Sequence, residues 1–362
     1  FLCVPYAVFL ALLGAVELGV RATRPYLSSL DAFVAAPEQQ AQFVDRHRVR
    51  VFEGDPLLFW RLQPNLRGVV WDKTRVTTNE RGLRYPAPVG RKAPGTFRIL
   101  CAGDSVTFGF RVPLVFDNRP EERQAERLPY PARLEKALRA ANPGRAIEVI
   151  PLAVPGYSSH QGLAWMRRDL EELQPDVVTL LYGWNDIGFR PQPDRVAMKT
   201  DRWSVASRAM LARSQALLHL WRFWHAPRGD PAAATRAQSL RVAREEFVAN
   251  HRAMVALART HGARAVVLGP IYRDREEYPA EAVFISSHRA ALRAAMAADG
   301  VPYLEFPELT EDAYPDNQAL FLEHIHPNHK GHRLLAEALL AYLARQGLLG
   351  DLHVPAAEAS RE

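Results

Sequence analysis

Short apolar runs alternate along the chain with segments of helical character. The runs have the length and composition of strands that are buried on both faces, and they lie at residues 98–102, 147–152, 176–181, 265–268 and 301–306. Helices are predicted in the segments between and beside them, with apolar residues four apart such as Leu134 and Leu138, at residues 130–141, 161–173, 239–260 and 286–298. This alternation predicts an α/β fold: a three-layer α/β/α sandwich around a central parallel sheet of five strands.

An apolar run occupies residues 1–20, and Glu17 is its one charged residue. A helix rises about 1.5 Å per residue, so a run of this length just crosses the hydrocarbon core of a bilayer. We therefore predict a membrane anchor helix over residues 1–24. The alternatives are a buried helix and a signal peptide, although no small-x-small cleavage site directly follows the run. Arg21 and Arg24 lie after the run, but the residues before it also decide the orientation, which stays open.

The rest of the chain divides into further parts. Residues 25–95 are predicted to form an N-terminal extension with short β-like pieces at 68–71 and 76–78. Residues 96–350 contain the strand and helix alternation and are predicted to form the main domain, and residues 351–362 form a tail. The chain thus combines one large α/β domain with an N-terminal helix and a small β extension.

The main domain contains an insertion at residues 189–238, and this insertion includes an amphipathic segment at residues 205–225. Its aromatic residues are Trp203, Trp221, Phe223 and Trp224. Aromatics at helical spacing most often pack in a core. A lid would instead use them to contact an acyl chain, a glycan or a membrane surface, and both interpretations stay open.

Composition and charge narrow the class of protein. The 362 residues are 48% hydrophobic, which suffices to bury a full core. The formal net charge of +6 comes from arginines scattered along the whole chain. No basic block interleaved with aromatic residues is present, so we expect no nucleic-acid partner. The two cysteines, Cys3 and Cys101, lie in apolar runs and indicate neither a disulfide framework nor a zinc site.

Residues 97–109 carry the first candidate for chemistry. An apolar run ends at Gly103, and Asp104 and Ser105 follow it directly. A serine just past the carboxyl end of a buried strand lies where open α/β sheets present their reactive groups. Ser105 is therefore a candidate nucleophile. The same residues are also typical of an ordinary turn between a strand and a helix, which is the alternative interpretation.

Three further segments, far apart in the sequence, favour the reactive interpretation. Gly156 lies in a PLAVPGYS segment, Asn185 lies in a GWND segment after a predicted strand, and His326 lies in an EHIHPN segment. This ordered set, together with Ser105, resembles the SGNH hydrolases, also called the GDSL esterase and lipase family. The family is named for that serine, glycine, asparagine and histidine, and the resemblance extends over residues 97–346.

The resemblance implies a flavodoxin-like SGNH fold and an acyl-transfer mechanism. A serine hydroxyl needs a base that takes its proton, and a histidine near neutral pH suits this task. His326 is the implied base, and the family places a carboxylate three residues before it, where this chain has Glu323 instead of the usual aspartate. Asp316 is the reserve candidate for this acid. The implied oxyanion-hole donors are Ser105, Gly156 and Asn185.

The side chains beside these motifs have less direct roles. Phe108, Tyr157 and Trp184 adjoin the motif residues and are candidates for substrate binding. Asp104 and Asp186 are expected to cap helices or to tie loops, because carboxylates at strand ends mostly do so. No cofactor and no metal is implied.

Two other functions compete with the esterase hypothesis. His324, His326, His329 and His332 are spaced like metal ligands, which suggests a metal-dependent hydrolase. Metallo-β-lactamase-type hydrolases, however, carry such a run early in the chain, with an aspartate where Asn328 stands here and further ligands downstream, whereas here only His353 follows. A catalytically inactive binding domain of the same fold is the second alternative.

The substrate is less defined than the mechanism. The resemblance implies an ester partner, either an acylated glycan or a lipid, and we favour acetyl or short acyl esters on an envelope polysaccharide. An O-acyltransferase of the same fold is the alternative, because water and an alcohol can attack the same acyl-serine. With the predicted anchor, the resemblance implies a membrane-anchored protein of bacterial type whose catalytic domain lies in the periplasm or outside the cell.

Overall fold

The computed structural model describes residues 3–30, 51–113, 127–225, 239–273, 279–306 and 317–354. The chain forms two compact units, each made of two stretches of sequence. The first unit consists of Phe1–Gln63 and Arg195–Ala237, and the second consists of Pro64–Asp194 and Gln238–Glu362. These two units do not test the predicted domain boundaries, which stay a prediction.

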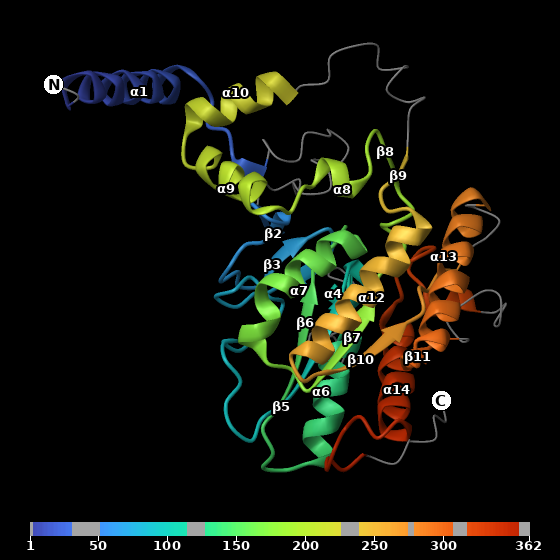
Figure 1. Ribbon diagram of the computed structural model, residues 1–362. Helices are drawn as coiled ribbons and strands as arrows, with labels where there is room; N and C mark the ends of the chain where they lie inside the picture. Colours follow the sequence, from blue (N-terminus) through green and yellow to red (C-terminus); the bar gives the residue numbers. More distant parts are fainter. Residues whose placement is uncertain are drawn as a thin grey trace. The chain divides into compact units, whose positions relative to one another are not determined.

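A parallel five-stranded sheet forms the centre of the second unit (Figure 1). Its strand order is β11-β10-β7-β5-β6, and the strands are β5 (Phe97–Gly103), β6 (Ile147–Ala153), β7 (Val177–Leu181), β10 (Arg264–Leu268) and β11 (Tyr303–Leu304). Every residue of the central strands β5 and β7 is buried, as expected for strands covered on both faces. The predicted α/β fold with five parallel strands is confirmed.

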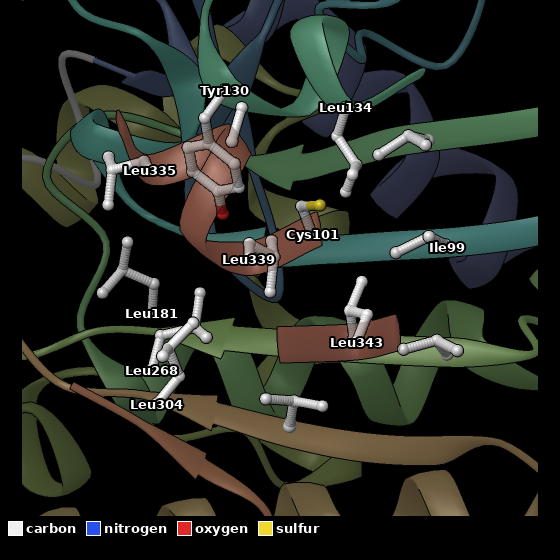
Figure 2. Packing of buried hydrophobic residues seen from close by; sticks show 14 of the residues in the cluster. Ile99, Cys101, Tyr130, Leu134, Leu181, Leu268, Leu304, Leu335, Leu339 and Leu343 are labelled. Atoms are coloured by element: carbon white, nitrogen blue, oxygen red, sulfur yellow. The ribbon is translucent and has the colours of Figure 1, made fainter. Parts of the chain in front are cut away.

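Helices cover both faces of this sheet, and the longer ones are α6 (Tyr130–Ala141), α7 (Ser159–Leu173), α12 (Arg244–Thr260), α13 (Pro279–Ala298) and α14 (His329–Arg345). Helices α6 and α14 pack together on one face, where Leu134 and Leu339 lie in one apolar cluster with Ile99 and Cys101 of β5 (Figure 2). Helices α7, α12 and α13 cover the other face, with α12 packed between the other two.

Some element boundaries differ from the sequence prediction. Helix α12 begins at Arg244, because Ser239–Leu240 forms a short strand, β9, that pairs with β8 (Phe189–Arg190). Helix α13 begins at Pro279, and proline is well suited to the first turn of a helix. Strand β11 is shorter than predicted, and Pro302 immediately before it has no backbone N–H for the ladder.

Part of the N-terminal extension braces the loop that follows Ser105. The antiparallel strands β3 (Val69–Trp71) and β4 (Thr74–Val76) lie in the second unit, as does Arg84. The Arg84 guanidinium donates to the carbonyl oxygens of Phe108, Gly109 and Val112 at 2.5, 2.8 and 2.8 Å. Arg84 of the extension therefore supports the loop after β5.

The first unit contains α1 (Cys3–Thr23), β1 (Phe52–Asp55), β2 (Phe59–Leu62), α9 (Arg202–Leu211) and α10 (Gln215–His225), with α8 (Asp194–Ala197) at its border with the second unit. The amphipathic segment predicted at 205–225 is thus divided between two helices. Trp203, Phe223 and Trp224 are 73%, 63% and 62% exposed. Within the described ranges no helix has the length and apolar character that crossing a membrane requires, and the anchor predicted over residues 1–24 finds no support there.

Candidate active site

The register of the central strands brings three sequence motifs to one edge of the sheet. In β5, Gly103 is aligned with Ala153 of β6 and with Leu181 of β7. The carboxyl ends of these adjacent strands are therefore level. The loops that leave them carry Ser105, Gly156 and Asn185 in turn, so residues far apart in the sequence come to the same edge of the sheet.

Ser105 is the first residue of the short helix α4 (Ser105–Phe108). Asp104 caps this helix, because its side chain accepts a hydrogen bond from the Val106 N–H at 3.0 Å. A Cβ at Gly103 would lie 2.0 Å from Thr107 Oγ1 and 2.9 Å from the Leu181 carbonyl oxygen, so this strand end has room only for glycine. The sharp turn that presents Ser105 thus depends on the small residue two positions before it.

His326 lies between the serine and an acid. Its Nε2 is 2.8 Å from Ser105 Oγ, and its Nδ1 contacts Glu323 Oε1 on the other side of the ring. A bridge between Phe321 and Pro327 closes the short loop that carries Glu323 and His326. This loop therefore holds the acid and the histidine together. Asp316, the reserve candidate for the acid, lies outside the described residues.

The surroundings of Glu323 favour its charged form. Burial raises the pKa of this carboxyl, but the hydrogen bond with His326 and the nearby charges of His326, His324 and Arg111 outweigh burial, and the net direction is downward. A charged carboxylate accepts the Nδ1–H of His326 and leaves Nε2 without a proton, as a base beside a serine hydroxyl requires.

Asn185 is held by the carboxylate that caps the serine helix. Its Nδ2 donates to Asp104 Oδ2 at 3.0 Å. Burial raises the pKa of Asp104 to about 6, although the Val106 N–H, the charge of His326 and the Asn185 amide act in the opposite direction. One carboxylate therefore connects the loop after β5 with the loop after β7.

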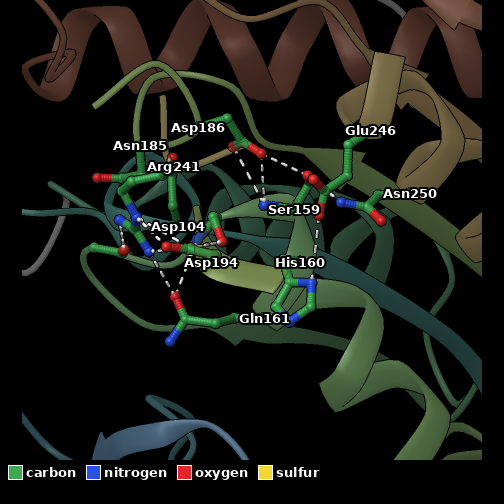
Figure 3. Close-up of polar contacts among 12 residues, drawn as sticks. Asp104, Ser159, His160, Gln161, Asn185, Asp186, Asp194, Arg241, Glu246 and Asn250 are labelled. Atoms are coloured by element: carbon green, nitrogen blue, oxygen red, sulfur yellow. Dashed lines mark hydrogen bonds and ion pairs between the residues drawn. The ribbon is translucent and has the colours of Figure 1, made fainter. Parts of the chain in front are cut away.

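Asp186 holds a different element, the beginning of helix α7. This fully buried carboxylate accepts from the Ser159 N–H at 3.0 Å and from the Ser159 hydroxyl (Figure 3). Asn250 of α12 donates to the same hydroxyl at 3.0 Å. Burial raises the pKa of Asp186 to about 7. Asp104 and Asp186 thus cap a helix and tie loops, as the sequence predicts.

The aromatic candidates for substrate binding differ in their exposure. Phe108 and Tyr157 are 1% and 0% exposed, and each contacts another aromatic ring, Trp71 and Trp165 respectively. Trp184 is half-buried, and its ring meets that of His324 edge-on at 5.0 Å. Of the three candidates, only Trp184 is partly exposed to solvent.

Sequence reasoning missed two groups near the histidine. The Phe110 ring lies 4.5 Å from the His326 ring, and the backbone N–H of Arg111 donates to Thr74 Oγ1 at 2.7 Å. The only sequence signal was their closeness to the GDS motif. Phe110 forms an apolar wall beside the base, and Arg111 adds positive charge near Glu323.

The histidine run is not gathered around a common point. Across the described ranges, no group of three or more histidine, cysteine, aspartate or glutamate side chains is arranged to hold a metal ion. His332 is 1% exposed, accepts from the Tyr130 N–H at 3.2 Å and stacks on the Tyr130 ring. Burial lowers the pKa of His332 to about 3. His332 therefore belongs to the core, whereas His326 faces Ser105.

Solved structures of similar fold include esterases and acylhydrolases. An acetylxylan esterase from Geobacillus stearothermophilus is 18% identical, with a TM-score of 0.45 over 72% of this chain and 97% of that one. A lipase/acylhydrolase from Enterococcus faecalis is 18% identical, with a TM-score of 0.44 over 72% of this chain and 100% of that one. No curated protein matches the chain.

A family model also matches the sequence itself. The match covers residues 101–334, which is more than half of the chain and includes Ser105, Gly156, Asn185 and His326. The chain therefore belongs to the GDSL-like lipase/acylhydrolase family.

Proposed function

We propose that the protein is a serine esterase that hydrolyses carboxylic esters through an acyl-serine intermediate. Membership of the GDSL-like lipase/acylhydrolase family supports a hydrolase of esters. The observation that carries the serine mechanism is the series of contacts from Ser105 Oγ to His326 Nε2, at 2.8 Å, and from His326 Nδ1 to Glu323.

The first half of the reaction forms the acyl-enzyme. The Ser105 hydroxyl gives its proton to His326 Nε2 while Oγ attacks the carbonyl carbon of the ester. Glu323 accepts the Nδ1–H and stabilises the imidazolium. His326 then gives the proton to the leaving alcohol, the bond between the carbonyl carbon and the alkoxy oxygen breaks, and the acyl group stays on Ser105.

The negative oxygen of the tetrahedral intermediate needs donors that are already in place. The proposed donors are the N–H groups of Ser105 and Gly156 and the side-chain amide of Asn185. An amide carries two N–H bonds, and Asn185 gives one of them to Asp104, so the other is left for the oxyanion. Each such donor contributes a factor of about 10²–10³ to the rate.

The second half of the reaction decides between hydrolysis and transfer. Water attacks the acyl-serine, His326 takes the water proton and returns it to Ser105 Oγ, and the carboxylic acid leaves. If a sugar hydroxyl replaces water, the same steps transfer the acyl group to a glycan. We propose hydrolysis, with O-acyl transfer as the alternative.

The proposed substrates are acetyl or short acyl esters on an envelope polysaccharide or a lipid. Trp184, half-buried beside His324, offers a stacking surface near the base and supports a sugar ring or a short acyl chain there. The proposed location of the catalytic domain is the periplasm or the outside of the cell. Fractionation of cells that express the tagged full chain tests this location.

The test of the mechanism compares residues inside and outside the proposed triad. Ser105→Ala should abolish hydrolysis of p-nitrophenyl acetate, and a serine-directed organophosphonate should label the wild type at Ser105. His326→Gln should lose activity by several orders of magnitude. His329→Gln is the matched control, because it removes a histidine that only the metal hypothesis needs, and it should keep its activity.

Opposite results would favour the other hypotheses. If EDTA removed the activity, zinc restored it and Ser105→Ala stayed active, the metal-dependent hydrolase would replace the serine esterase. If neither the chromogenic esters nor the organophosphonate reacted with the folded protein, the inactive binding domain would replace it. A p-nitrophenyl ester series of increasing acyl length, with and without a sugar acceptor, then separates hydrolysis from transfer.

A further inference from the structure

Arg241 is a buried arginine that the family motifs do not include. It is 4% exposed and directly follows β9, which pairs with β8 in the loop after β7. Its backbone N–H donates to the Gly188 carbonyl oxygen at 2.7 Å, and its carbonyl oxygen accepts from the Asp194 N–H at 2.7 Å. Two backbone bonds therefore fix the base from which the side chain extends.

The Arg241 guanidinium extends from this base to the loop that carries Gly156. Its Nη1 donates to the Gly156 carbonyl oxygen at 2.7 Å, and its Nη2 donates to Gln161 Oε1 at 2.9 Å. Nη2 also donates to Asp194 Oδ2 at 2.8 Å, and Nε donates to the same carboxylate at 3.1 Å (Figure 3). The planar group thus holds a backbone carbonyl, an amide and a carboxylate in one fixed arrangement.

The partners of Arg241 are themselves tied to the residues after Gly156. The Ser158 hydroxyl donates to Asp194 at 2.6 Å, and the Ser158 N–H donates to Gln161 Oε1 at 3.3 Å. Burial raises the pKa of Asp194, but the charge and hydrogen bonds of Arg241 outweigh burial and lower it overall. The lowered pKa favours the charged form of Asp194, and both the Gly156 carbonyl and the Ser158 hydroxyl are held by this pair of side chains.

Gly156 needs such support because of its conformation. Its φ is +85°, in the left-handed region that glycine adopts readily and other residues rarely adopt. The Tyr157 N–H donates to the Val154 carbonyl oxygen at a long 3.3 Å, which restrains the turn only weakly. The bond from Arg241 is the shorter one, and it fixes the peptide group that follows Gly156.

We propose that Arg241 is a positioning residue for the oxyanion hole. By holding the Gly156 carbonyl, it fixes the orientation of this residue and keeps its N–H aimed at the oxyanion. The proposal rests on the proposed function, because it gives the Gly156 N–H its role there. Arg241 acts through Gly156, so its role is positioning rather than catalytic.

Two variants of Arg241 test this proposal. Arg241→Gln removes the charge and the bonds to Asp194, and Arg241→Lys keeps a charge for Asp194 but cannot also reach the Gly156 carbonyl with a planar group. Both should lower kcat by up to about 10²-fold, the value of one misplaced oxyanion donor, with KM little changed. Phenylboronic acid, which forms a tetrahedral adduct on the serine, should bind weaker by a similar factor.

Arg98 offers a matched control at the opposite end of β5. It is 2% exposed, donates from Nε to Glu148 at 2.6 Å, and donates from Nη1 to the carbonyl oxygens of Gly90 and Leu173 at 2.8 and 2.6 Å. Arg98→Gln should reduce the melting temperature, as Arg241→Gln should, but it should leave kcat and boronate affinity unchanged. A merely structural role for Arg241 predicts the same behaviour in both variants.

The outcomes separate this proposal from the proposed function. Wild-type kcat and boronate affinity in folded Arg241→Lys and Arg241→Gln would overturn the positioning role while Ser105 remains the nucleophile. Unfolding of both variants would assign Arg241 to the fold alone and would also overturn it. Activity that survives Ser105→Ala would instead overturn the proposed function, and that result does not depend on any Arg241 variant.

Discussion

Asn185 donates its side-chain amide to the carboxylate of Asp104 at 3.0 Å, while the same carboxylate caps the helix that begins at Ser105. The loop after β7 and the loop after β5 therefore share one anion. In the proposed mechanism this bond orients the Asn185 amide, so that its second N–H can meet the oxyanion.

Replacement of Asp104 should thus harm catalysis more than stability. Asp104→Ala removes a cap, which costs about 1 kcal/mol of unfolding free energy. It also frees the Asn185 amide, and we expect kcat to fall by about 10²-fold because an oxyanion donor is no longer oriented. The measurements are kcat with p-nitrophenyl acetate and urea unfolding.

Asp201 provides the control for this change. It caps α9 by accepting from the Trp203 and Ser204 N–H groups at 3.1 and 3.0 Å. Asp201→Ala should lose a similar amount of local helix stability and keep wild-type kcat. Equal kcat values in Asp104→Ala and the wild type would show that Asn185 does not need its partner.

The buried carboxyl of Asp186 should make stability depend on pH. Its pKa is raised from 3.8 to about 7 by burial, so between about pH 4 and pH 7 the folded chain keeps a proton that the unfolded chain has lost. Unfolding then releases a proton, and the Asp186 contribution to stability falls as pH rises through this window. Asp186→Asn cannot ionise, so its unfolding free energy relative to the wild type should rise from pH 4 to pH 7.

Urea unfolding at several pH values measures this difference. Asp299 serves as a control with the opposite sign, because its hydrogen bond with Arg252 lowers its pKa. Asp299→Asn should therefore lose stability relative to the wild type as pH rises through the range in which an exposed aspartate titrates. A constant difference between Asp186→Asn and the wild type across the pH range would contradict the buried-carboxyl account.

The sequence predicts those parts of the fold that depend on local patterns. Five apolar runs mark the strands of the central sheet, and their alternation with helices is typical of parallel pairing. The order and register of β5, β6 and β7, which bring Ser105, Gly156 and Asn185 to one edge, come from the structure. The structure of the insertion is harder to predict from the sequence, because β8 and β9 have two residues each and carry no periodic pattern.

Contacts between distant residues account for what the sequence does not reveal. Arg241 reaches Gly156 across 85 positions, and nothing in the local pattern around Arg241 distinguishes it from the many scattered arginines. Glu17 is a second case. In the sequence it is the one charge in an apolar run, whereas in the first unit it caps α10 across about 200 positions.

Loss of the Glu17 carboxylate should therefore loosen α10. It accepts from the Ser214 hydroxyl at 2.7 Å and from the Gln215 and Ala216 N–H groups at 2.9 and 3.0 Å. The hydrogen bond from the Ala216 N–H is the largest cause that lowers the pKa of Glu17 to about 2. The stabilisation from this carboxylate is therefore fully present above pH 4.5 and is lost as pH falls through about 2. Glu17→Gln should speed amide hydrogen exchange at neutral pH in residues 215–219.

The amides of α9 provide an internal reference for this exchange experiment, because Asp201 caps that helix independently of Glu17. Exchange in α9 should change less than exchange in the first turn of α10. Equal protection of residues 215–219 in Glu17→Gln and the wild type would mean that the carboxylate contributes nothing to the start of α10.

Glu323 stands where the family usually has the shorter aspartate. Glu323→Gln keeps the size of the side chain but presents a neutral amide to His326 Nδ1. The amide can hold the imidazole in the wrong tautomer and cannot stabilise its cation, so kcat should fall by about 10⁴-fold with the fold intact. The lowered pKa of Glu323 agrees with a charged acid at neutral pH.

Glu323→Asp tests geometry separately from charge. It keeps the carboxylate but shortens its reach by one methylene, while the bridge between Phe321 and Pro327 keeps the loop closed around the native length. We expect activity between a mild loss and a small gain. Asp316→Asn should have normal turnover, and thermal melting excludes unfolding in all three variants. Near-normal kcat in Glu323→Gln would remove Glu323 from the triad, and a collapse of kcat in Asp316→Asn alone would transfer the role of the acid to Asp316.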